Sequence, residues 1–305
     1  MIPLPARMAT AVAVIVPALV VYAQEPAFRS GSDLVIVPTT VTNQSGRFVR
    51  GLTASDFEIL EDGNRRPLAQ FSANRVPVSV VILLDISGSM STEPNRWNLT
   101  QRAVASFLSR LEANDEVTVV VFNDRSERLG GWTRHTFDVF SALGRVKTGG
   151  GTALFRALTS ALPVLREASQ PRRVLLLISD GNDHSGDRFG APTPGAVGRE
   201  RALDSLRRSG AALYAIGIGR GHEPVDRRTL GDLSEPTGAY FEMASTAAML
   251  EAAVGRVADD LRDQYILAFE PAKTDGAFHD IQIKTRDSEL RVRSRNGYVA
   301  APRHP

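Results

Sequence analysis

Residues 80–90 read VVILLDISGSM, an apolar run followed at once by oxygen-bearing side chains. The run is too short for a buried helix and is rich in β-branched residues, so it predicts a strand buried on both faces. Open α/β sheets place their ligand sites at the carboxyl ends of such strands. Asp85, Ser87 and Ser89 alternate along the following loop, where Gly88 permits a tight turn. Three side-chain oxygens could therefore face one point, which suggests a site for a hard cation.

Two later loops have the same character. The sequence TGGGTAL at 148–154 places three glycines before Thr152, where we expect a helix to begin. The sequence SDGNDHSG at 179–186 follows another predicted buried strand and places Asp180 at the end of that strand. We expect both loops to emerge at the same edge of the sheet as Asp85, because the predicted strands run parallel.

The chain is long enough, at 305 residues, for two domains. Between residues 78 and 261, strands alternate with helices of ten or more residues, which is typical of parallel βαβ units in a doubly wound α/β fold. The helices are recognised by apolar stripes of helical spacing, namely Val104, Phe107, Leu108 and Leu111 in one and Leu250, Val254, Val257 and Leu261 in another. The buried strands are predicted at 80–85, 117–122, 174–179, 211–219 and 239–243.

The flanks of this block read as short strands, at 33–71 and again at 264–300, with a hairpin turn signal at Asp62 and Gly63. Neither flank has enough strands for a stable sandwich alone. We therefore predict that segments 24–77 and 262–300 pair into one β-rich domain, interrupted by an inserted domain at 78–261 and followed by a tail at 301–305. Two independent hairpins packed on the central block are the alternative.

Near the end of the chain, Arg291, Arg293 and Arg295 alternate along one predicted strand. We expect them to form a solvated sheet face, because Asp287 and Glu289 stand close by. A basic binding stripe is the alternative interpretation.

The first 23 residues have the pattern of a signal peptide, with one basic residue at Arg7, an apolar run at 8–23 and small residues at its end. We expect cleavage between Ala23 and Gln24 and no stable membrane span afterwards. A membrane anchor is the competing interpretation, but the run contains Pro17 and is shorter than the roughly 20 residues that span a bilayer. The predicted location is therefore outside the cytoplasm, periplasmic or extracellular.

Composition and motifs argue against several classes of function. Removal of Arg7 with the leader lowers the count of Lys and Arg from 36 to 35 against 34 acidic residues, and this near-neutral balance argues against a nucleic-acid partner. The chain has no cysteine, so disulfides and thiolate chemistry are excluded. The sequence contains neither the HExxH pattern of zinc hydrolases nor a GxSxG elbow, and His184 is the only histidine near the proposed ion.

The ordered set of DISGS, GGGTAL and ISDG resembles the metal-ion-dependent adhesion site of the von Willebrand factor type A family. The resemblance covers roughly residues 78–261 and includes the strand AALYAIGIG. The layout is also similar to an exported group, the VWFA-related acidobacterial family, in the segments GRFVRGLTASDFEILEDG, YILAFEP and RVRSRNGYV. Arg156 departs from the acidic residue expected just after GGTAL, and we expect it to alter the charge near the ion without removing a ligand.

The resemblance implies a site for Mg²⁺, or for Mn²⁺ or Ca²⁺, made by Asp85, Ser87, Ser89, Thr152 and Asp180. It implies that the three hydroxyls bind the ion directly or nearly so, while the two carboxylates act largely through water. Neutral ligands leave the ion positive, so a carboxylate from an Asp or Glu of a protein partner is expected as a further ligand. The expected function is adhesion or protein binding without catalysis. The alternatives are a structural or assembly module whose ion only stabilises the fold, and a metal-dependent enzyme or enzyme-assembly factor.

Overall fold

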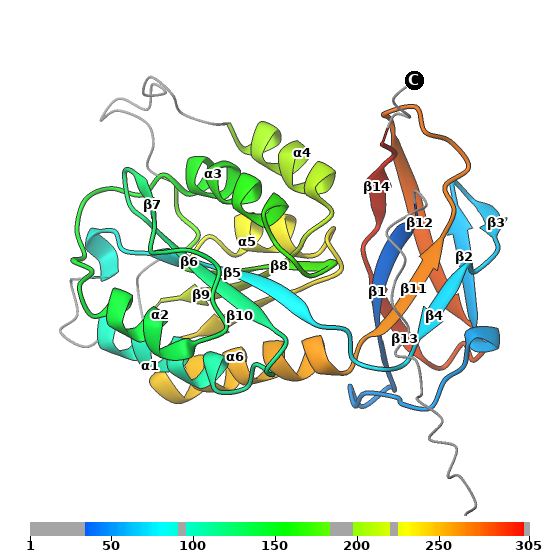
Figure 1. Cartoon of the computed structure of the whole chain (residues 1–305), viewed down its shortest axis with the longest axis horizontal. Coiled ribbons are helices and arrows are strands. Elements are labelled where there is room, and N and C mark those ends of the chain that lie inside the picture. Colours follow the sequence, from blue (N-terminus) through cyan, green and yellow to red (C-terminus); the bar gives the residue numbers. More distant parts are fainter. Residues whose placement is uncertain (1–33, 91–95, 184–197, 220–224, 302–305) are drawn as a thin grey trace, which may run out of the picture.

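The structure, a computed structural model, describes residues 34–90, 96–183, 198–219 and 225–301. The described part forms an α/β domain beside a β-rich domain (Figure 1). The expected signal peptide and His184 lie outside the described residues. None of the helices found in the described ranges is both long and apolar enough to cross a bilayer.

The α/β domain is built on a six-stranded sheet with the order β10-β9-β8-β5-β6-β7. All neighbours in this sheet are parallel except β7, which pairs with β6 in the antiparallel sense. Every residue of β5 is buried, as its uninterrupted apolar run predicts. The strands are β5 (Val78–Asp85), β6 (Glu116–Phe122), β7 (Ser126–Arg128), β8 (Arg172–Ser179), β9 (Ala212–Ile218) and β10 (Phe241–Ala244).

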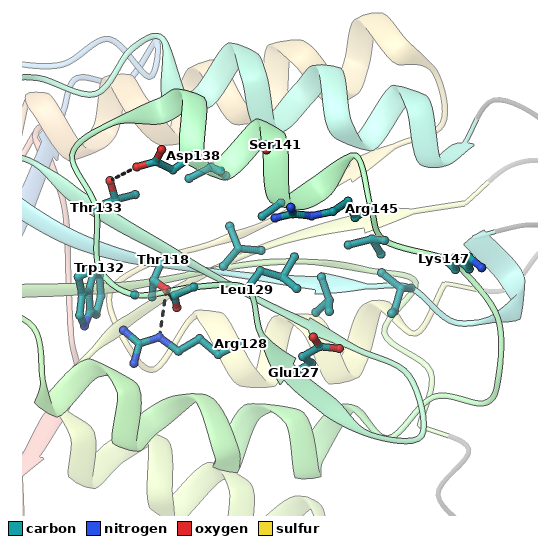
Figure 2. Close-up of a pocket in the computed structure, with 18 of the residues that line it drawn as sticks. Thr118, Glu127, Arg128, Leu129, Trp132, Thr133, Asp138, Ser141, Arg145 and Lys147 are labelled. Atoms are coloured by element: carbon teal, nitrogen blue, oxygen red, sulfur yellow. Dashed lines mark hydrogen bonds between the residues drawn. The ribbon is translucent and has the colours of Figure 1, made fainter.

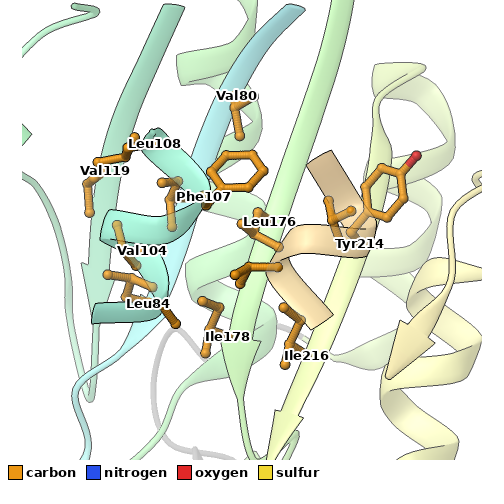
Figure 3. Packing of buried hydrophobic residues seen from close by; sticks show 14 of the residues in the cluster. Val80, Leu84, Val104, Phe107, Leu108, Val119, Leu176, Ile178, Tyr214 and Ile216 are labelled. Atoms are coloured by element: carbon orange, nitrogen blue, oxygen red, sulfur yellow. The ribbon is translucent and has the colours of Figure 1, made fainter. Parts of the chain in front are cut away.

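Helices cover both faces of the sheet, because alternate residues of β5 point to opposite sides. Val80, Ile82 and Leu84 pack in one cluster with α1, α2 and α6 (Figure 3). Val81 and Leu83 pack in a second cluster with α3, α4 and α5. The helices are α1 (Arg96–Leu108), α2 (Thr136–Leu143), α3 (Leu154–Arg166), α4 (Arg199–Ser209), α5 (Arg227–Ser234) and α6 (Ala247–Arg262).

The β-rich domain contains two four-stranded sheets, with the orders β13-β1-β11-β4 and β14-β12-β2-β3. Each sheet combines strands from both ends of the chain: β1 lies between β11 and β13, and β2 pairs with β12. One apolar cluster fills the space between the sheets. The strands are β1 (Val35–Thr42), β2 (Phe57–Glu61), β3 (Asn64–Arg66), β4 (Gln70–Ser72), β11 (Tyr265–Phe269), β12 (Phe278–Thr285), β13 (Arg291–Ser294) and β14 (Gly297–Val299).

These sheets confirm the predicted fold class, a doubly wound α/β domain with a β-rich part formed from both flanks. The turn signal at Asp62 and Gly63 is also confirmed. Both residues have positive φ, 49° and 77°, and they join β2 to β3. Positive φ at both central positions is the requirement of the tight hairpin turns that suit the twist of paired strands.

Three local predictions are wrong. Helix α1 ends at Leu108, so Leu111 lies beyond it, although its side chain still packs against the same core. Helix α3 begins at Leu154 and not at Thr152, because the backbone of Thr152 and Ala153 is still part of the preceding loop. The third error concerns the arginines near the end of the chain: Arg291 is exposed, but Arg293 and Arg295 are turned toward the α/β domain and are partly buried.

Candidate metal site

The predicted site begins with Asp85, the last residue of β5, which has no exposed surface. Its Oδ1 accepts a hydrogen bond from the backbone nitrogen of Ser87 at 2.8 Å, and its Oδ2 accepts one from the hydroxyl of Ser179 at 2.7 Å. Burial raises the pKa of Asp85 to about 6, the hydrogen bonds oppose this shift, and the negative charge of Asp180 adds to it. The carboxylate is thus fixed in position within a site where a cation would favour its charged form.

A one-turn 3-10 helix, η2 (Gly88–Met90), follows β5. Ser89 lies within it, and Ser87 is the residue before it. Their hydroxyl oxygens are 3.1 Å apart and hydrogen-bonded to each other. The backbone nitrogen of Met90 donates to the carbonyl of Ser87 at 3.0 Å and closes the turn, while the Met90 side chain is buried in the core. The turn therefore anchors the two hydroxyls, together with the Asp85 carboxylate, at the end of β5.

The glycine loop lies directly against this turn. Gly88 N donates to Gly150 O at 2.9 Å, and Gly149 N donates to Ile86 O at 2.7 Å. Gly150 has a φ of 86°, and a Cβ at this position would come within 2.6 Å of the Asp124 carboxylate. Only glycine allows this backbone conformation together with so close an approach. These two backbone hydrogen bonds bring the second predicted loop to the first.

Thr152 follows the glycines and is 4% exposed. Within the part of the chain that the structure describes, its hydroxyl has no hydrogen-bond partner. The oxygen is not among the fully buried polar atoms that lack a partner, so it keeps contact with solvent and is accessible to a ligand. A bound cation would satisfy this oxygen.

Asp180 is half-buried and comes directly after β8, the neighbour of β5. Its Oδ1 accepts a hydrogen bond from Asn182 N at 3.0 Å, and the effect of its charge on the pKa of Asp85 shows that the two carboxylates are close. Asp183 ties the same loop to α3, since its Oδ2 accepts from Phe155 N at 3.1 Å. Within the described residues, no hydrogen bond links the side chain of Asp180 or Thr152 to those of Asp85, Ser87 and Ser89.

Sequence reasoning missed three residues that hold the site. Ser179 fixes Asp85, and Asn123 Nδ2 donates to Gly149 O at 2.8 Å. Asp124 accepts a hydrogen bond from Gly151 N at 2.8 Å. The signal for Asn123 and Asp124 was present, because these two polar residues directly follow the buried strand β6 at the same edge of the sheet. Arg156 donates a hydrogen bond to the backbone carbonyl of Asp124, so its guanidinium lies beside the glycine loop.

The donor set fits a hard cation. Three hydroxyls and two carboxylates provide oxygen ligands only, the type that Mg²⁺, Mn²⁺ and Ca²⁺ prefer. In the described ranges there is no group of three or more His, Asp or Glu side chains that could hold a metal, so any ion here must depend on the hydroxyls. The buried, fixed Asp85 carboxylate and the accessible Thr152 hydroxyl are two features that suit such an ion.

A large groove lies next to this edge of the sheet, between α2 and the β6–β7 pair (Figure 2). Its volume is about 960 Å³, and its lining reaches the metal-site loops at Ile86, Asn123 and Lys147. Aliphatic side chains from β6 and α2 form its floor, while Arg145 and Lys147 supply positive charge at its rim. The indole nitrogen of Trp132, also in its lining, is buried and has no hydrogen-bond partner among the described residues.

Comparison with known proteins identifies the central domain. Residues 80–182 match the family model of the von Willebrand factor type A domain, so the chain contains a type A domain as its sequence predicts. A curated protein from Synechocystis sp., described as uncharacterized, is 28% identical over 116 residues, which are 37% of this chain and 27% of that protein. Calcium-activated chloride channel regulator 1 of Bos taurus is 23% identical over 167 residues, which are 53% of this chain and 17% of the regulator. The chain thus spans about a quarter or less of the length of these relatives.

Solved structures share the fold. A von Willebrand factor type A protein from Catenulispora acidiphila is similar over 90% of this chain and 76% of its own, with 15% identity and a TM-score of 0.53. Proximal thread matrix protein 1 from the mussel byssus, with a zinc-occupied MIDAS motif, is similar over 66% of this chain and 49% of its own, with 18% identity and a TM-score of 0.51. The PilB minor pilin from Streptococcus sanguinis, as a D319A mutant, is similar over 63% of each chain, with 12% identity and a TM-score of 0.52. At these identities the likeness shows the fold.

Proposed function

We propose that the type A domain binds a divalent cation through Asp85, Ser87, Ser89, Thr152 and Asp180, and that this site captures a protein partner. The observation that carries the proposal is the meeting of two loops at the end of β5, where backbone hydrogen bonds of Gly88 and Gly149 hold the turn of Ser87 and Ser89 against the glycine loop that leads to Thr152. When bound, a cation with mostly neutral ligands would attract a carboxylate from outside the chain. Mg²⁺ is the ion we favour, with Mn²⁺ and Ca²⁺ as alternatives.

The chain's own residues prepare this edge for a ligand. Ser179 and the backbone of Ser87 hold the Asp85 carboxylate in one orientation, so it loses little freedom on binding. The glycine loop, fixed by Asn123 and Asp124, presents Thr152 without side chains in the way. A site that is ordered in advance binds more tightly than one that must be organised by its ligand.

The partner we propose is a protein that offers an Asp or Glu side chain to the ion. The groove beside the site supports this choice. Its four basic side chains outnumber its two acidic ones and would favour an acidic segment, and its aliphatic floor would accept apolar side chains. The charged residues are Arg125, Arg128, Arg145 and Lys147 against Glu127 and Asp138. Type A domains often mediate adhesion or protein interactions, and the zinc-occupied MIDAS motif of the mussel protein shows that this fold can hold a divalent metal. We propose binding and not catalysis as the role of this site.

We also propose that the protein acts outside the cytoplasm. The signal-peptide pattern at residues 1–23 supports export. The similarity of both flanks to the exported acidobacterial group supports the same location.

Two measurements test the proposal. Calorimetric titration of the chain with Mg²⁺ and Mn²⁺ should show one saturable site, and the absence of binding by any divalent cation would contradict it. The chain, immobilised, should then capture specific envelope proteins from its host in the presence of Mg²⁺ and release them on chelation. Partners that stay bound after chelation would instead indicate a structural module, and turnover of a substrate would indicate an enzyme.

A further inference from the structure

A second pocket lies between the two domains, far from the metal site. Its volume is about 400 Å³, and it is lined by β1 on one side and by the start of β8 and the end of α4 on the other. Four arginines line it, Arg172, Arg173, Arg208 and Arg295, and no acidic side chain among the described residues does. Arg172 and Arg173 begin β8, whereas the metal site lies beyond the other end of that strand. The length of an eight-residue strand, about 26 Å, separates the two sites.

Arg172 is a buried cation with only neutral partners. It is 3% exposed. Its Nη1 donates to the carbonyls of Val76 and Leu261 at 2.8 and 3.0 Å, and its Nη2 donates to Gln264 Oε1 at 2.5 Å. Its Nε is buried without a partner in the described part of the chain. No carboxylate forms a hydrogen bond or ion pair with this guanidinium in the described part of the chain. Burial lowers its pKa because the charged form has lost its hydration, and the nearby charges of Asp260 and Asp115 oppose this shift.

Arg295 is partly buried and also has a neutral hydrogen-bond partner. Its Nε donates to Gly297 O at 2.9 Å, and its guanidinium lies 5.8 Å from the centre of the Tyr298 ring. Burial lowers the pKa of Arg295 to about 10. Arg173 forms no hydrogen bond or ion pair with any described residue, and its buried Nε is unsatisfied. Of the four arginines, Arg208 has a carboxylate partner, Asp204 at 2.8 Å, on the surface of α4.

Positive charge that is only partly compensated in a buried pocket costs free energy, and a bound anion would offset that cost. We propose that the interdomain pocket binds a small organic oxyanion, with its phosphate or carboxylate group between Arg173 and Arg295 and with the buried charge of Arg172 adding to the positive potential there. Guanidinium groups match both oxyanions through paired N–H donors. The rest of the lining fits a short apolar portion of the ligand, since Ile36, Pro38 and Pro271 contribute to the wall.

Such a ligand would contact both domains at once. Arg172 and Arg173 belong to the α/β domain, and Arg295 follows β13 of the β-rich domain. An anion between them would therefore stabilise the folded chain in proportion to its concentration, independently of any divalent cation.

Inorganic phosphate and succinate are the probes, titrated into the full chain in the presence of a chelator and at constant ionic strength set with NaCl. We expect saturable binding of one or both by calorimetry and a rise in the melting temperature with concentration. The relative affinity of the two probes distinguishes a phosphate-bearing from a carboxylate-bearing ligand. Arg173→Gln and Arg295→Gln should each weaken binding by about tenfold or more, as expected for loss of a charge-assisted hydrogen bond.

Arg201→Gln is the matched control, because Arg201 is an exposed arginine of α4 outside the pocket lining. It removes the same charge and should leave binding unchanged. Arg173→Gln breaks no hydrogen bond or ion pair between described residues, so it reports on binding even if Arg295→Gln fails to fold. Failure of both probes to bind saturably would overturn the proposal, as would equal affinities in wild type and Arg173→Gln or equal losses in Arg173→Gln and Arg201→Gln.

Discussion

Arg293 Nη2, on β13, donates to Asp260 Oδ1, on α6, at 2.7 Å, and this ion pair joins the β-rich domain to the last helix of the type A domain. Asp260 is 1% exposed and also accepts hydrogen bonds from the hydroxyls of Thr40 at 2.8 Å and Tyr214 at 2.6 Å. Three segments far apart in the sequence thus meet at one buried carboxylate. Helix α6 is thereby fixed to β1 and β13 and not merely connected to β11 by the chain.

Asp260→Asn should strongly destabilise the protein. The substitution removes the negative charge that compensates the partly buried guanidinium of Arg293, and breaking such a buried pair typically costs about 3–5 kcal/mol in the free energy of unfolding. Denaturant unfolding monitored by circular dichroism measures the loss. Asp259→Asn is the control, because Asp259 is the preceding residue of α6 and its ion pair with Arg262, at 3.6 Å, is on the surface, where such pairs contribute about 0–1 kcal/mol. Equal effects of the two substitutions would contradict the role given to Asp260.

Thr152→Val should lower the affinity for Mg²⁺ by about 10-fold to 100-fold, a range typical of losing a supporting group at a metal site. The metal-free stability should change by less than about 1 kcal/mol, because the hydroxyl has no hydrogen bond to lose among the described residues and valine has nearly the same shape. Calorimetric titration and thermal unfolding measure the two quantities. Thr159→Val makes the same change within α3, away from the loop, and should leave the affinity unaltered. An unchanged affinity in Thr152→Val would remove Thr152 from the site.

Gly238→Ala should be far more damaging than Gly276→Ala. Both glycines have positive φ, 80° and 77°, a conformation that costs other residues about 1–2 kcal/mol. Around Gly276 there is open space, so this strain is the whole cost. A Cβ on Gly238 would overlap the backbone of Ser294 and Arg295, where the β-rich domain contacts the type A domain. We expect the free energy of unfolding to fall by at least about 2 kcal/mol more in Gly238→Ala, a cost in the range of overpacked cores. Equal losses of unfolding free energy in the two variants, measured by denaturant titration, would show that the backbone at Ser294 and Arg295 moves aside to accept the added methyl group.

His279 should make the stability of the β-rich domain depend on pH. Its ring nitrogens lie 2.7 Å from Asp62 Oδ2 and 3.0 Å from Asp275 Oδ1, and these hydrogen bonds raise its pKa above the usual 6.5. The protonated form is therefore favoured by folding, and its contribution is complete below pH 6.5 and is lost as pH rises through the folded pKa. The pKa values of Asp62 and Asp275 are lowered by the same contacts and by backbone hydrogen bonds, so their contribution is lost at low pH, below their usual value of 3.8.

The difference in melting temperature between wild type and His279→Gln measures this effect. It should be larger at about pH 5.5 than at about pH 8.5, because at the higher pH the wild type loses the charged histidine that the variant never had. A difference that stays constant or grows with pH would show that the histidine acts through packing alone.

A chain ending at Leu261 should leave the N-terminal strands without protection. Strand β1 lies between β11 and β13, and β2 pairs with β12, so the truncation removes the neighbours of both. The remaining strands β1 to β4 cannot form either sheet, and their amides should exchange rapidly with solvent. Hydrogen exchange measured by mass spectrometry tests this, with β5 as the internal reference. Protection of residues 35–42 equal to that in the full chain would show that the N-terminal flank folds alone.

Local patterns in the sequence determined the elements and the edge at which the proposed site lies. The apolar run before Asp85 predicted a strand buried on both faces, and the apolar runs of β6 and β8 predicted the same. Parallel strands end at one edge, so the loops carrying Ser87 and Asp180, which follow β5 and β8, were predicted to converge without knowledge of a single contact. The expectation that Thr152 joins them could not rest on this argument, because the glycine loop follows helix α2 and not a strand. In the structure the hydrogen bonds of Gly88 and Gly149 join the glycine loop to the turn that carries Ser87.

Only the tertiary structure decided which distant residues meet. Nothing in the sequence marks Ser179 as the partner of Asp85, or Asp260 as the partner of Arg293. The arginines at 291–295 show the physical reason. Alternating positions in a strand indicate that residues share a face of the sheet, but they do not indicate whether that face is exposed to solvent or packed against another domain. Arg291 meets solvent, whereas Arg293 and Arg295 meet the type A domain, because β13 pairs with β1 at the junction of the two domains. Pairing between strands some 250 residues apart is a property of the folded chain, and it creates both the Asp260 network and the arginine-lined pocket.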